Sequence, residues 1–254
     1  MAREATFFDI PLNRFTDRSL EIRLEEALSG LSQTLIATPN PEMLMAARAD
    51  NSIAQVLYRM HVRIPDGFGV SLMSVLTGQG KLRRFPGTDV LVDIARLASK
   101  KDMHMMIVGG WDDTSDRAKL ILESAFPGIR VSHISDVSIS YDGTWDQPES
   151  VLKQIADSQP DILAVALGSA DYQKQERWIA DFAPSFASVK IAIGIGGAID
   201  MIAGKTKRAP KLMQSMGIEW LWRLIRQPAR FKRIFTAVIL FPIAVIQDTI
   251  TSRK

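Results

Sequence analysis

Glycine and short polar residues stand directly after several runs of apolar residues in this sequence. They are Thr38-Pro39-Asn40, Pro65-Asp66-Gly67, Gly109-Gly110, Gly168-Ser169 and Gly194-Ile195-Gly196-Gly197. Glycine lets backbone N–H groups approach a phosphate closely. Because ligands of open α/β sheets bind at the carboxyl ends of the strands, these residues predict a crevice for a nucleotide.

Asp66 is the acidic residue of this set. It lies in the sequence Ile64-Pro65-Asp66-Gly67-Phe68-Gly69, between a short strand and an apolar helix. Pro-Asp-Gly is a favoured turn sequence, so turn chemistry alone can explain Asp66. Alternatively, a carboxylate at the end of a strand is placed to act as a general base, and partial burial raises its pKa. The residues alone leave both interpretations open.

The glycines from Gly194 to Gly197 resemble part of a dinucleotide-binding fingerprint, but their spacing differs. The pattern Gly-x-Gly-x-x-Gly would need a glycine where Ile199 stands. This spacing disfavours a nicotinamide cofactor and leaves two interpretations, a tight turn or a contact with another kind of phosphate. The sequence also lacks a Walker A motif and the Gly-x-Ser-x-Gly motif of many hydrolases.

Metal-ligand patterns are absent from the sequence. The three histidines, His61, His104 and His133, have no ligand-like spacing, and the chain has no cysteine and no Asp-x-Asp pair. Without thiolates, a disulfide framework, a zinc–thiolate site and an iron–sulfur cluster are all excluded. We therefore expect neither a metal nor a cofactor.

The elements that must position these residues alternate between strands and helices. Apolar runs without polar alternation predict buried strands at Thr34–Thr38, Met103–Val108, Ile162–Leu167 and Lys190–Ile195. Helical patterns lie between them, at Pro41–Asp50, Asp89–Ala98, Ser115–Ala125, Ser150–Ala156 and Gln173–Phe182. This alternation predicts an α/β fold with a mostly parallel, Rossmann-like sheet and helices on both faces. The charged, weakly periodic residues before Ser32 are interpreted as an N-terminal lead-in.

The charge is divided unevenly along the 254 residues. Residues 1–204 hold 20 Lys or Arg and 26 Asp or Glu, a net charge of −6, whereas residues 205–254 hold 11 and 2, a net charge of +9. We therefore predict an α/β domain at 1–204 and a basic, helical C-terminal appendage at 205–254. A basic appendage on an acidic body indicates an anionic partner, either a membrane surface or nucleic acid.

The appendage carries four regularly spaced arginines. Arg223, Arg226, Arg230 and Arg233 follow one another at intervals of 3, 4 and 3, which places them on one face of a continuous helix. Pro228 is expected to kink or restart that helix. Apolar and aromatic residues around the arginines favour an amphipathic segment on an anionic membrane over an ordinary solvated helix face. No nucleic-acid-binding motif is present, so nucleic acid is not expected as a partner.

The longest apolar run is Ala237–Ile246. Its ten residues are fewer than the ~20 that span a bilayer as a helix, and Pro242 interrupts them. Met1 to Ile10 contain acidic residues and no apolar signal region. We therefore expect a cytoplasmic protein with peripheral contact to the inner face of the plasma membrane. The oligomeric state stays open, because the apolar residues of the appendage also offer a surface for self-association into a homo-oligomer.

Taken in order, these motifs resemble the WecG/TagA/CpsF family of bacterial glycosyltransferases. The resemblance extends from about Thr34 to Arg233. The first motifs that carry it are Thr38-Pro39-Asn40-Pro41-Glu42, Pro65-Asp66-Gly67-Phe68-Gly69-Val70 and Arg84-Phe85-Pro86-Gly87-Thr88-Asp89. The later ones are Gln175-Glu176-Arg177-Trp178, Gly194-Ile195-Gly196-Gly197-Ala198-Ile199-Asp200, Arg208-Ala209-Pro210, Glu219-Trp220-Leu221-Trp222-Arg223-Leu224 and Pro228-Ala229-Arg230.

The resemblance implies transfer of a sugar, with inversion and without a required metal, from a UDP-sugar to a saccharide on undecaprenyl diphosphate. Asp66 would deprotonate the acceptor hydroxyl, and Arg84 would stabilise the diphosphate of the donor or the leaving UDP. Substrate-binding residues would be Thr38, Asn40, Gln175, Gly196, Gly197 and Asp200, joined by the strand-end glycines Gly109 and Gly110. The arginines that would contact the membrane or the diphosphate are Arg208, Arg223, Arg226, Arg230 and Arg233.

One departure from the family pattern concerns the loop before Gln175. The family usually shows Gly-x-Pro-Lys/Arg-Gln-Glu, whereas residues 168–176 lack the proline and form a loop about three residues longer. Donor choice is expected to differ with this loop, and the donated sugar, the acceptor saccharide and the final polymer stay open. Two alternatives to a transferase are a nicotinamide-dependent oxidoreductase and a non-catalytic, peripheral membrane scaffold.

Overall fold

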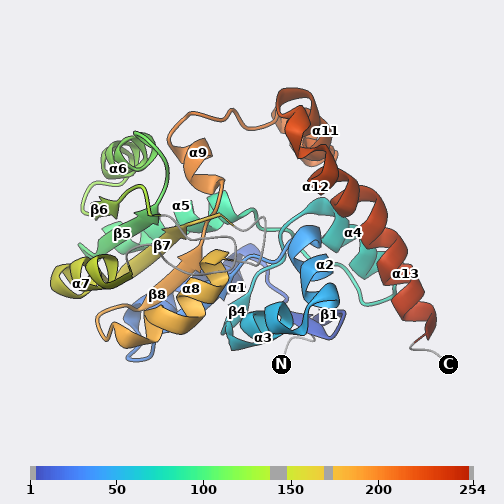
Figure 1. The fold of residues 1–254 in the computed structure, drawn as a ribbon, viewed down its shortest axis with the longest axis horizontal. Coiled ribbons are helices and arrows are strands. Elements are labelled where there is room, and N and C mark those ends of the chain that lie inside the picture. The colour runs from blue at the N-terminus through green and yellow to red at the C-terminus, as the bar shows by residue number, and fades with distance from the viewer. Residues whose placement is uncertain (1–3, 138–147, 169–173, 252–254) are drawn as a thin grey trace.

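A six-stranded parallel sheet forms the centre of the protein (Figure 1). The computed structural model describes residues 4–137, 148–168 and 174–251. In spatial order the strands are β4 (Val62–Arg63), β3 (Thr34–Ala37), β8 (Ile191–Gly194), β7 (Ile162–Ala166), β5 (His104–Gly109) and β6 (Arg130–Ile134). The predicted α/β class, with its parallel sheet and helices, is confirmed. The strands β3, β5, β7 and β8 lie where the apolar runs predicted them.

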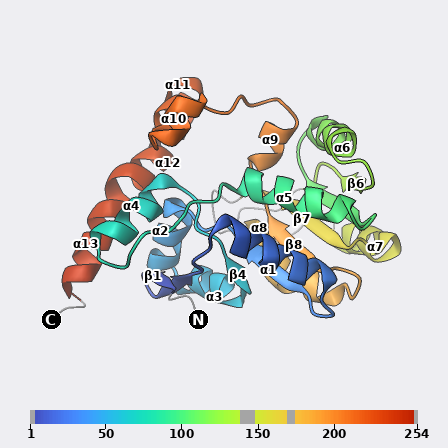
Figure 2. The same ribbon diagram turned by 180° about the vertical axis from the view of Figure 1, so that it is seen from behind.

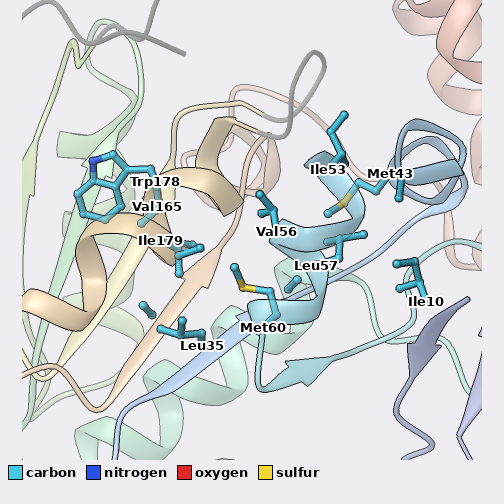
Figure 3. Close-up of a cluster of buried hydrophobic side chains, with 14 of the residues drawn as sticks. Ile10, Leu35, Met43, Ile53, Val56, Leu57, Met60, Val165, Trp178 and Ile179 are labelled. Atoms are coloured by element: carbon cyan, nitrogen blue, oxygen red, sulfur yellow. The ribbon is translucent and has the colours of Figure 1, made fainter. Parts of the chain in front are cut away.

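Alternation along the strands separates two apolar clusters, one on each face of the sheet. Leu35 and Val165 belong to the first cluster, whereas their neighbours Ile36 and Ala164 belong to the second. Successive side chains of a strand point to opposite faces, so a strand that is apolar throughout is covered on both sides. In the first cluster Leu35 and Val165 are joined by Leu57 and Ile179 from helices on that face (Figure 3).

Helices cover both faces, as predicted, and Figure 2 shows α1 and α5 in front of the sheet. Buried residues of α2 (Pro41–Ala49), α3 (Asn51–Arg59), α4 (Phe68–Leu76), α7 (Pro148–Ser158) and α8 (Lys174–Phe182) belong to the first cluster. Those of α1 (Asp17–Ser29), α5 (Gly87–Ser99), α6 (Thr114–Ala125) and α9 (Ala198–Ile202) belong to the second.

The residues before Ser32 are not a mere lead-in, so that interpretation is wrong. They form an antiparallel hairpin, β1 (Ala5–Phe7) with β2 (Ile10–Leu12), followed by α1. The hairpin turns through Phe8 and Asp9, both with positive φ. A capping box at Thr16 begins α1, whose buried face contains Leu20, Leu24 and Leu28. The i, i+4 spacing of these leucines was the signal for a packed helix.

The C-terminal segment leaves the sheet after α9 and passes along one side of the molecule, drawn in red in Figure 1. Its short helices α10 (Lys211–Ser215) and α11 (Glu219–Arg226) come first. Gln227 then departs from helical geometry, with φ −139° and ψ 70°, and a 3-10 turn follows at Pro228–Arg230. The predicted restart at Pro228 is confirmed, and it divides the four arginines between two helical pieces.

The helix after this break is longer than the sequence suggested. It continues through α12 (Phe231–Phe235), a π-helical turn (Thr236–Leu240) and α13 (Phe241–Thr251). The expectation that Pro242 interrupts it is wrong: the wide π turn precedes the proline and is the kind of local adjustment that accommodates its missing N–H. By length and composition, the 24 residues Pro228–Thr251 are long and apolar enough to cross a membrane, and 17% of their most apolar window is buried within the protein.

Phe241 anchors this helix to the first apolar cluster. Its side chain is fully buried, and its ring centroid lies 5.7 Å from that of Phe7 and 6.0 Å from that of Phe8. The end of the chain therefore shares a core with its beginning. The division of the chain into domains at Lys205 stays a prediction.

Truncation of this anchor tests the shared core. Phe241→Ala is expected to lower the free energy of unfolding by about 3 kcal/mol, because it leaves a cavity among packed aromatic rings. Phe235→Ala is the matched control, since Phe235 lies on the same helix and is 42% exposed. Urea denaturation of both variants measures the difference. Equal, small losses for the two variants would show that α13 does not contribute to the core.

Candidate functional site

A cleft of about 320 Å³ lies at the carboxyl ends of the parallel strands. We call it the first cleft. Residues that follow β3, β4, β5, β7 and β8 form its floor, and the C-terminal segment forms another wall. The lining includes most of the predicted site residues, namely Thr38, Asn40, Asp66, Gly110, Gln175, Gly196, Gly197, Asp200, Arg223, Arg230 and Arg233.

Asp66 is positioned by the loops that surround it. Its N–H donates to the carbonyl of Pro39 at 2.9 Å, which joins the loop after β4 to the loop after β3. The N–H of Gly67 donates to Oδ1 of Asp66 at 2.6 Å. Gly67 has φ +89°, and a Cβ there would lie 2.9 Å from Cδ of Pro41, so only glycine fits this turn without a shift. The Pro-Asp-Gly turn therefore exists, and it presents the carboxylate to the cleft.

Burial raises the pKa of the Asp66 carboxyl above its usual value. The nearby guanidinium groups of Arg223 and Arg84 and the hydrogen bond from Gly67 act in the opposite direction, while the carboxylate of Glu219 adds to the rise. A carboxyl group with a raised pKa and a surface open to a cleft is suited to accept a proton from a bound ligand.

Three arginines of the C-terminal segment face the same cleft. The pKa of Arg230 is lowered, first by burial and then by the positive charges of Arg233 and Arg223. Gly197 lies close by, since a Cβ there would be 3.9 Å from Nη2 of Arg230 and 3.7 Å from Oδ2 of Asp200. A half-buried guanidinium group beside two further arginines forms a binding site for an anion with several oxygens, such as a diphosphate.

A second cleft, of about 250 Å³, adjoins the first. Asn40, Asp66 and Arg223 line both, so the carboxylate of Asp66 stands at their junction. Its other polar lining residues are Glu42, Arg84 and Glu219, and the rest of its wall is largely apolar, with side chains from α4, α11 and the helix Pro228–Thr251. The apolar lining is Phe68, Leu72, Trp220, Ile234, Ala237, Val238 and Pro242.

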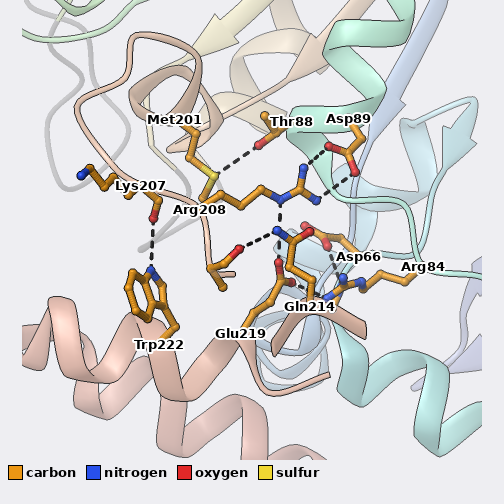
Figure 4. Close-up of polar contacts among 12 residues, drawn as sticks. Asp66, Arg84, Thr88, Asp89, Met201, Lys207, Arg208, Gln214, Glu219 and Trp222 are labelled. Atoms are coloured by element: carbon orange, nitrogen blue, oxygen red, sulfur yellow. Dashed lines mark hydrogen bonds and ion pairs between the residues drawn. The ribbon is translucent and has the colours of Figure 1, made fainter. Parts of the chain in front are cut away.

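Arg84 lines this second cleft and is absent from the lining of the first. Its guanidinium donates to Oε2 of Glu219 in α11 (Figure 4). The other oxygen of Glu219 lies 3.8 Å from Nε of Arg208, which binds Asp89 at the start of α5 through two hydrogen bonds of 2.5 and 2.9 Å. This chain of ion pairs attaches α11 to the body beside Asp66.

Three predicted site residues lie elsewhere. Arg208 and Arg226 line a small third pocket of about 20 Å³, where the guanidinium of Arg226 lies 5.6 Å from the ring centre of Trp222. Gly109 lies under the first cleft and not in its lining. A Cβ on Gly109 would lie 2.6 Å from the carbonyl oxygen of Ala166, so this glycine is required for the close approach of β5 to β7.

Gln175 lines the first cleft but is only 4% exposed. Its Oε1 accepts a hydrogen bond of 2.8 Å from the N–H of Gly196, and its Nε2 donates to Oε1 of Glu176 at 2.6 Å. Burial raises the pKa of Glu176 to about 7. Residues 169–173 of the loop before Gln175 lie outside the described residues, so the predicted effect of that loop on donor choice stays a prediction.

Sequence reasoning missed several residues of the clefts. Trp111, Thr88 and Gln227 line the first cleft, and Glu219 lines the second. Trp111 follows Gly110 directly, so it could have been predicted from the rule that ligands of α/β sheets bind at the carboxyl ends of the strands. Glu219 stands in a motif that carries the family resemblance, but its ion pair was not predictable, because its partner Arg84 lies 135 positions away. Among the described residues, no group of three or more His, Asp or Glu side chains is placed to hold a metal ion.

The comparison with known protein families decides the class of this protein. A model described as the glycosyl transferase WecG/TagA/CpsF family matches residues 5–254. The chain belongs to the WecG/TagA/CpsF family of glycosyltransferases. This finding confirms the family expected from the motifs and extends it to the hairpin at the beginning of the chain. It also makes the protein an enzyme, which argues against both the oxidoreductase and the non-catalytic scaffold.

Three relatives of this glycosyltransferase share one name, N-acetylglucosaminyldiphosphoundecaprenol N-acetyl-beta-D-mannosaminyltransferase. A relative from Bacillus subtilis (strain 168) is 35% identical over 202 residues, 80% of this chain and 75% of the relative. One from Bacillus spizizenii is 32% identical over 79% of this chain and 74% of its own length. One from Staphylococcus aureus (strain MRSA252) is 27% identical over 86% and 83%.

The arginine cluster of this glycosyltransferase generates a prediction about anion binding. Arg230→Gln is expected to weaken the binding of inorganic pyrophosphate about tenfold or more, because a charge-assisted hydrogen bond contributes about 1.5–3 kcal/mol. Arg226→Gln, four residues away and outside both clefts, is the matched control and is expected to change the affinity less than twofold. Titration calorimetry measures both. Equal losses would mean that net charge, and not the cleft, attracts the anion.

Proposed function

We propose that this glycosyltransferase transfers N-acetylmannosamine from a UDP-sugar to N-acetylglucosamine that is linked through diphosphate to undecaprenol, in the assembly of a bacterial cell-envelope polysaccharide. The donated sugar and the acceptor are those in the shared name of the relatives. The observation that carries the proposal is the position of Asp66 between a polar, arginine-lined cleft and an apolar cleft.

The first cleft is suited to the nucleotide-sugar donor. Arg223, Arg230 and Arg233 line the cleft and can bind the diphosphate, Arg233 while its Nε donates to Oε2 of Glu42 at 2.6 Å. Asn40 and Asp66 line both clefts, and the sugar would be placed beside them, with Thr38 in the lining of the first cleft. Asp200, beside Gly197, would meet the nucleoside together with the glycine turn.

The second cleft is suited to the lipid-linked acceptor. Its walls of Phe68, Leu72, Trp220 and Val238 offer apolar surface to a polyprenyl chain. Arg84 lies on this side of Asp66 and would bind the diphosphate of the acceptor after exchanging its ion pair with Glu219. In this arrangement Arg84 serves the acceptor and the three arginines of the C-terminal segment serve the donor.

The two clefts allow a single displacement at Asp66. The acceptor hydroxyl attacks the anomeric carbon of the donor from the second cleft and gives its proton to the Asp66 carboxylate. The bond from the anomeric carbon to the diphosphate breaks, and UDP leaves in the first cleft with its charge neutralised by the arginines. Attack on one side and departure on the other invert the configuration of the anomeric carbon. This proposed step uses no resident cofactor. Activity of the enzyme in the presence of EDTA tests whether the reaction is independent of metal ions.

Replacement of the base tests this mechanism. D66N is expected to lower kcat/KM by about 10²- to 10⁴-fold, the usual contribution of a general base. In the wild-type enzyme, kcat/KM rises with pH as Asp66 loses its proton, and this rise begins above the usual range of aspartate because burial raises the pKa. Asp157→Asn, on the exposed face of α7, is the control. Near-normal turnover of folded D66N would refute the assignment.

We further propose that the enzyme binds the inner face of the plasma membrane peripherally. The C-terminal helix and α4 expose a set of apolar side chains next to the mouth of the second cleft, where a polyprenyl chain must leave the bilayer. The exposed residues are Leu72, Val75, Leu76, Phe231, Phe235, Ile239, Leu240, Ile243, Ile246 and Ile250. The exposed cations Lys207, Lys211 and Lys232 favour anionic lipids.

Vesicle binding tests this surface. The double variant Ile243→Asp, Ile246→Asp is expected to lose co-sedimentation with vesicles of phosphatidylcholine and phosphatidylglycerol, because both side chains are about half exposed on α13. The matched control is Leu120→Asp, Ile121→Asp, which changes two exposed apolar residues of α6 on the body. Equal sedimentation of both variants and the wild type would exclude docking through α13.

A further inference from the structure

Glu176 is a buried carboxyl group that the proposed mechanism does not use. It lies in the first turn of α8 and is only 1% exposed. Its Oε1 accepts a hydrogen bond from Nε2 of Gln175, and within the described part of the chain its Oε2 has no hydrogen-bond partner. A buried carboxyl group that is only half satisfied destabilises a fold relative to an apolar side chain of similar size. Its presence therefore calls for a reason other than stability.

The amide of Gln175 has two different ends, and Glu176 determines which way they point. The Oε1 end accepts from the N–H of Gly196, and the Nε2 end donates to Glu176. In the reversed orientation, the NH₂ group would face the N–H of Gly196 and the amide oxygen would face the carboxylate. Donor would then meet donor and acceptor would meet acceptor. The carboxylate thus fixes the amide in the orientation that binds Gly196.

Gln175 and Glu176 also pack closely against the end of β8, which leads into the glycine turn on the floor of the first cleft. A Cβ at Gly194, the last residue of β8, would lie 2.7 Å from Oε1 of Glu176 and 2.8 Å from Nε2 of Gln175. The backbone beyond it is held by the bond from the N–H of Ile195 to the carbonyl of Val165, 2.8 Å long, and by the bond from Gly196 to Gln175. The turn at Gly196 and Gly197, which lines the cleft, is therefore built on the Gln175–Glu176 pair.

We propose that Glu176 is a positioning residue for the diphosphate-bearing donor, acting through the Gln175 amide on the glycine turn at Gly196 and Gly197. The proposal rests on the proposed function, in which the first cleft holds the donor. Glu176 touches no substrate. It keeps the turn in the conformation that presents its backbone to the ligand, next to Arg230 and Asp200.

Protonation of Glu176 makes its hydrogen bond to Gln175 depend on pH, which a side chain that only fills space would not do. Burial raises its pKa to about 7, while the hydrogen bonds from Gln175 and from its own backbone N–H act to lower it. Among the described residues no charged side chain contributes to this shift. An ionised carboxylate is the stronger acceptor, so the hold on Gln175 strengthens as the pH rises through about 7.

Two variants of the full chain test the proposal, with UDP and inorganic pyrophosphate as probes. E176M is expected to keep or raise the Tm, because it removes a buried carboxyl group, and to weaken the binding of both probes about tenfold or more. E176Q retains an acceptor for Gln175 and is expected to restore most of the affinity. The ratio of wild-type to E176Q affinity should rise between pH 6 and pH 8. Glu149→Met, an exposed residue in the first turn of α7, is the matched control.

Titration calorimetry and thermal unfolding distinguish the outcomes. Wild-type affinity in E176M overturns the proposal. It is also overturned if E176M lowers both the Tm and the affinity and E176Q restores neither, because the role of Glu176 is then only structural. A wild-type enzyme that binds pyrophosphate but not UDP contradicts the proposed donor instead, and the pyrophosphate arm still tests Glu176.

Discussion

The ion pair between Arg84 and Glu219 holds the C-terminal segment against the body at the point where the two clefts meet. Both side chains are mostly buried, so removal of either one leaves a charge without its partner in a poorly solvated place. Arg208 and Asp89 extend the pair to the start of α5. With α11 fixed in this way, Arg223 reaches Asp66, and the helix that follows closes the apolar cleft.

The sheet was predictable because its strands are buried on both faces. Thr34–Thr38 and Ile162–Leu167 are apolar without alternation, and only a covered parallel strand explains such runs in an α/β pattern. The same logic located the first cleft, because glycines and short polar residues after strands gather at one edge. Thr38, Asn40 and Asp66 were found in this way and by family resemblance, and all three line that cleft.

The C-terminal segment was harder to predict, because the spacing of its four arginines fits a continuous helix that the chain does not form. The intervals of 3, 4 and 3 align Arg223, Arg226, Arg230 and Arg233 only if the helix is continuous. At Gln227 the backbone leaves helical geometry, so Arg230 and Arg233 lie on a different helical piece from Arg223 and Arg226. Arg226 contacts Trp222, one turn earlier in α11, whereas the other three arginines line the first cleft. Contacts between distant residues, such as Gln175 with Gly196, leave no trace in a periodic pattern.

Arg223 is the one cation that lines both clefts, within the part of the chain that the structure describes. Its positive charge lowers the pKa of Asp66, against the effect of burial. A diphosphate bound to Arg223 would neutralise part of that charge, and the carboxylate of Asp66 would become more basic as a result. In the proposed mechanism, binding of the donor thereby increases the proton affinity of the carboxylate that would activate the acceptor. By reciprocity, if the bound donor changes the affinity for the acceptor, the bound acceptor changes the affinity for the donor by the same factor, whichever of the two binds first.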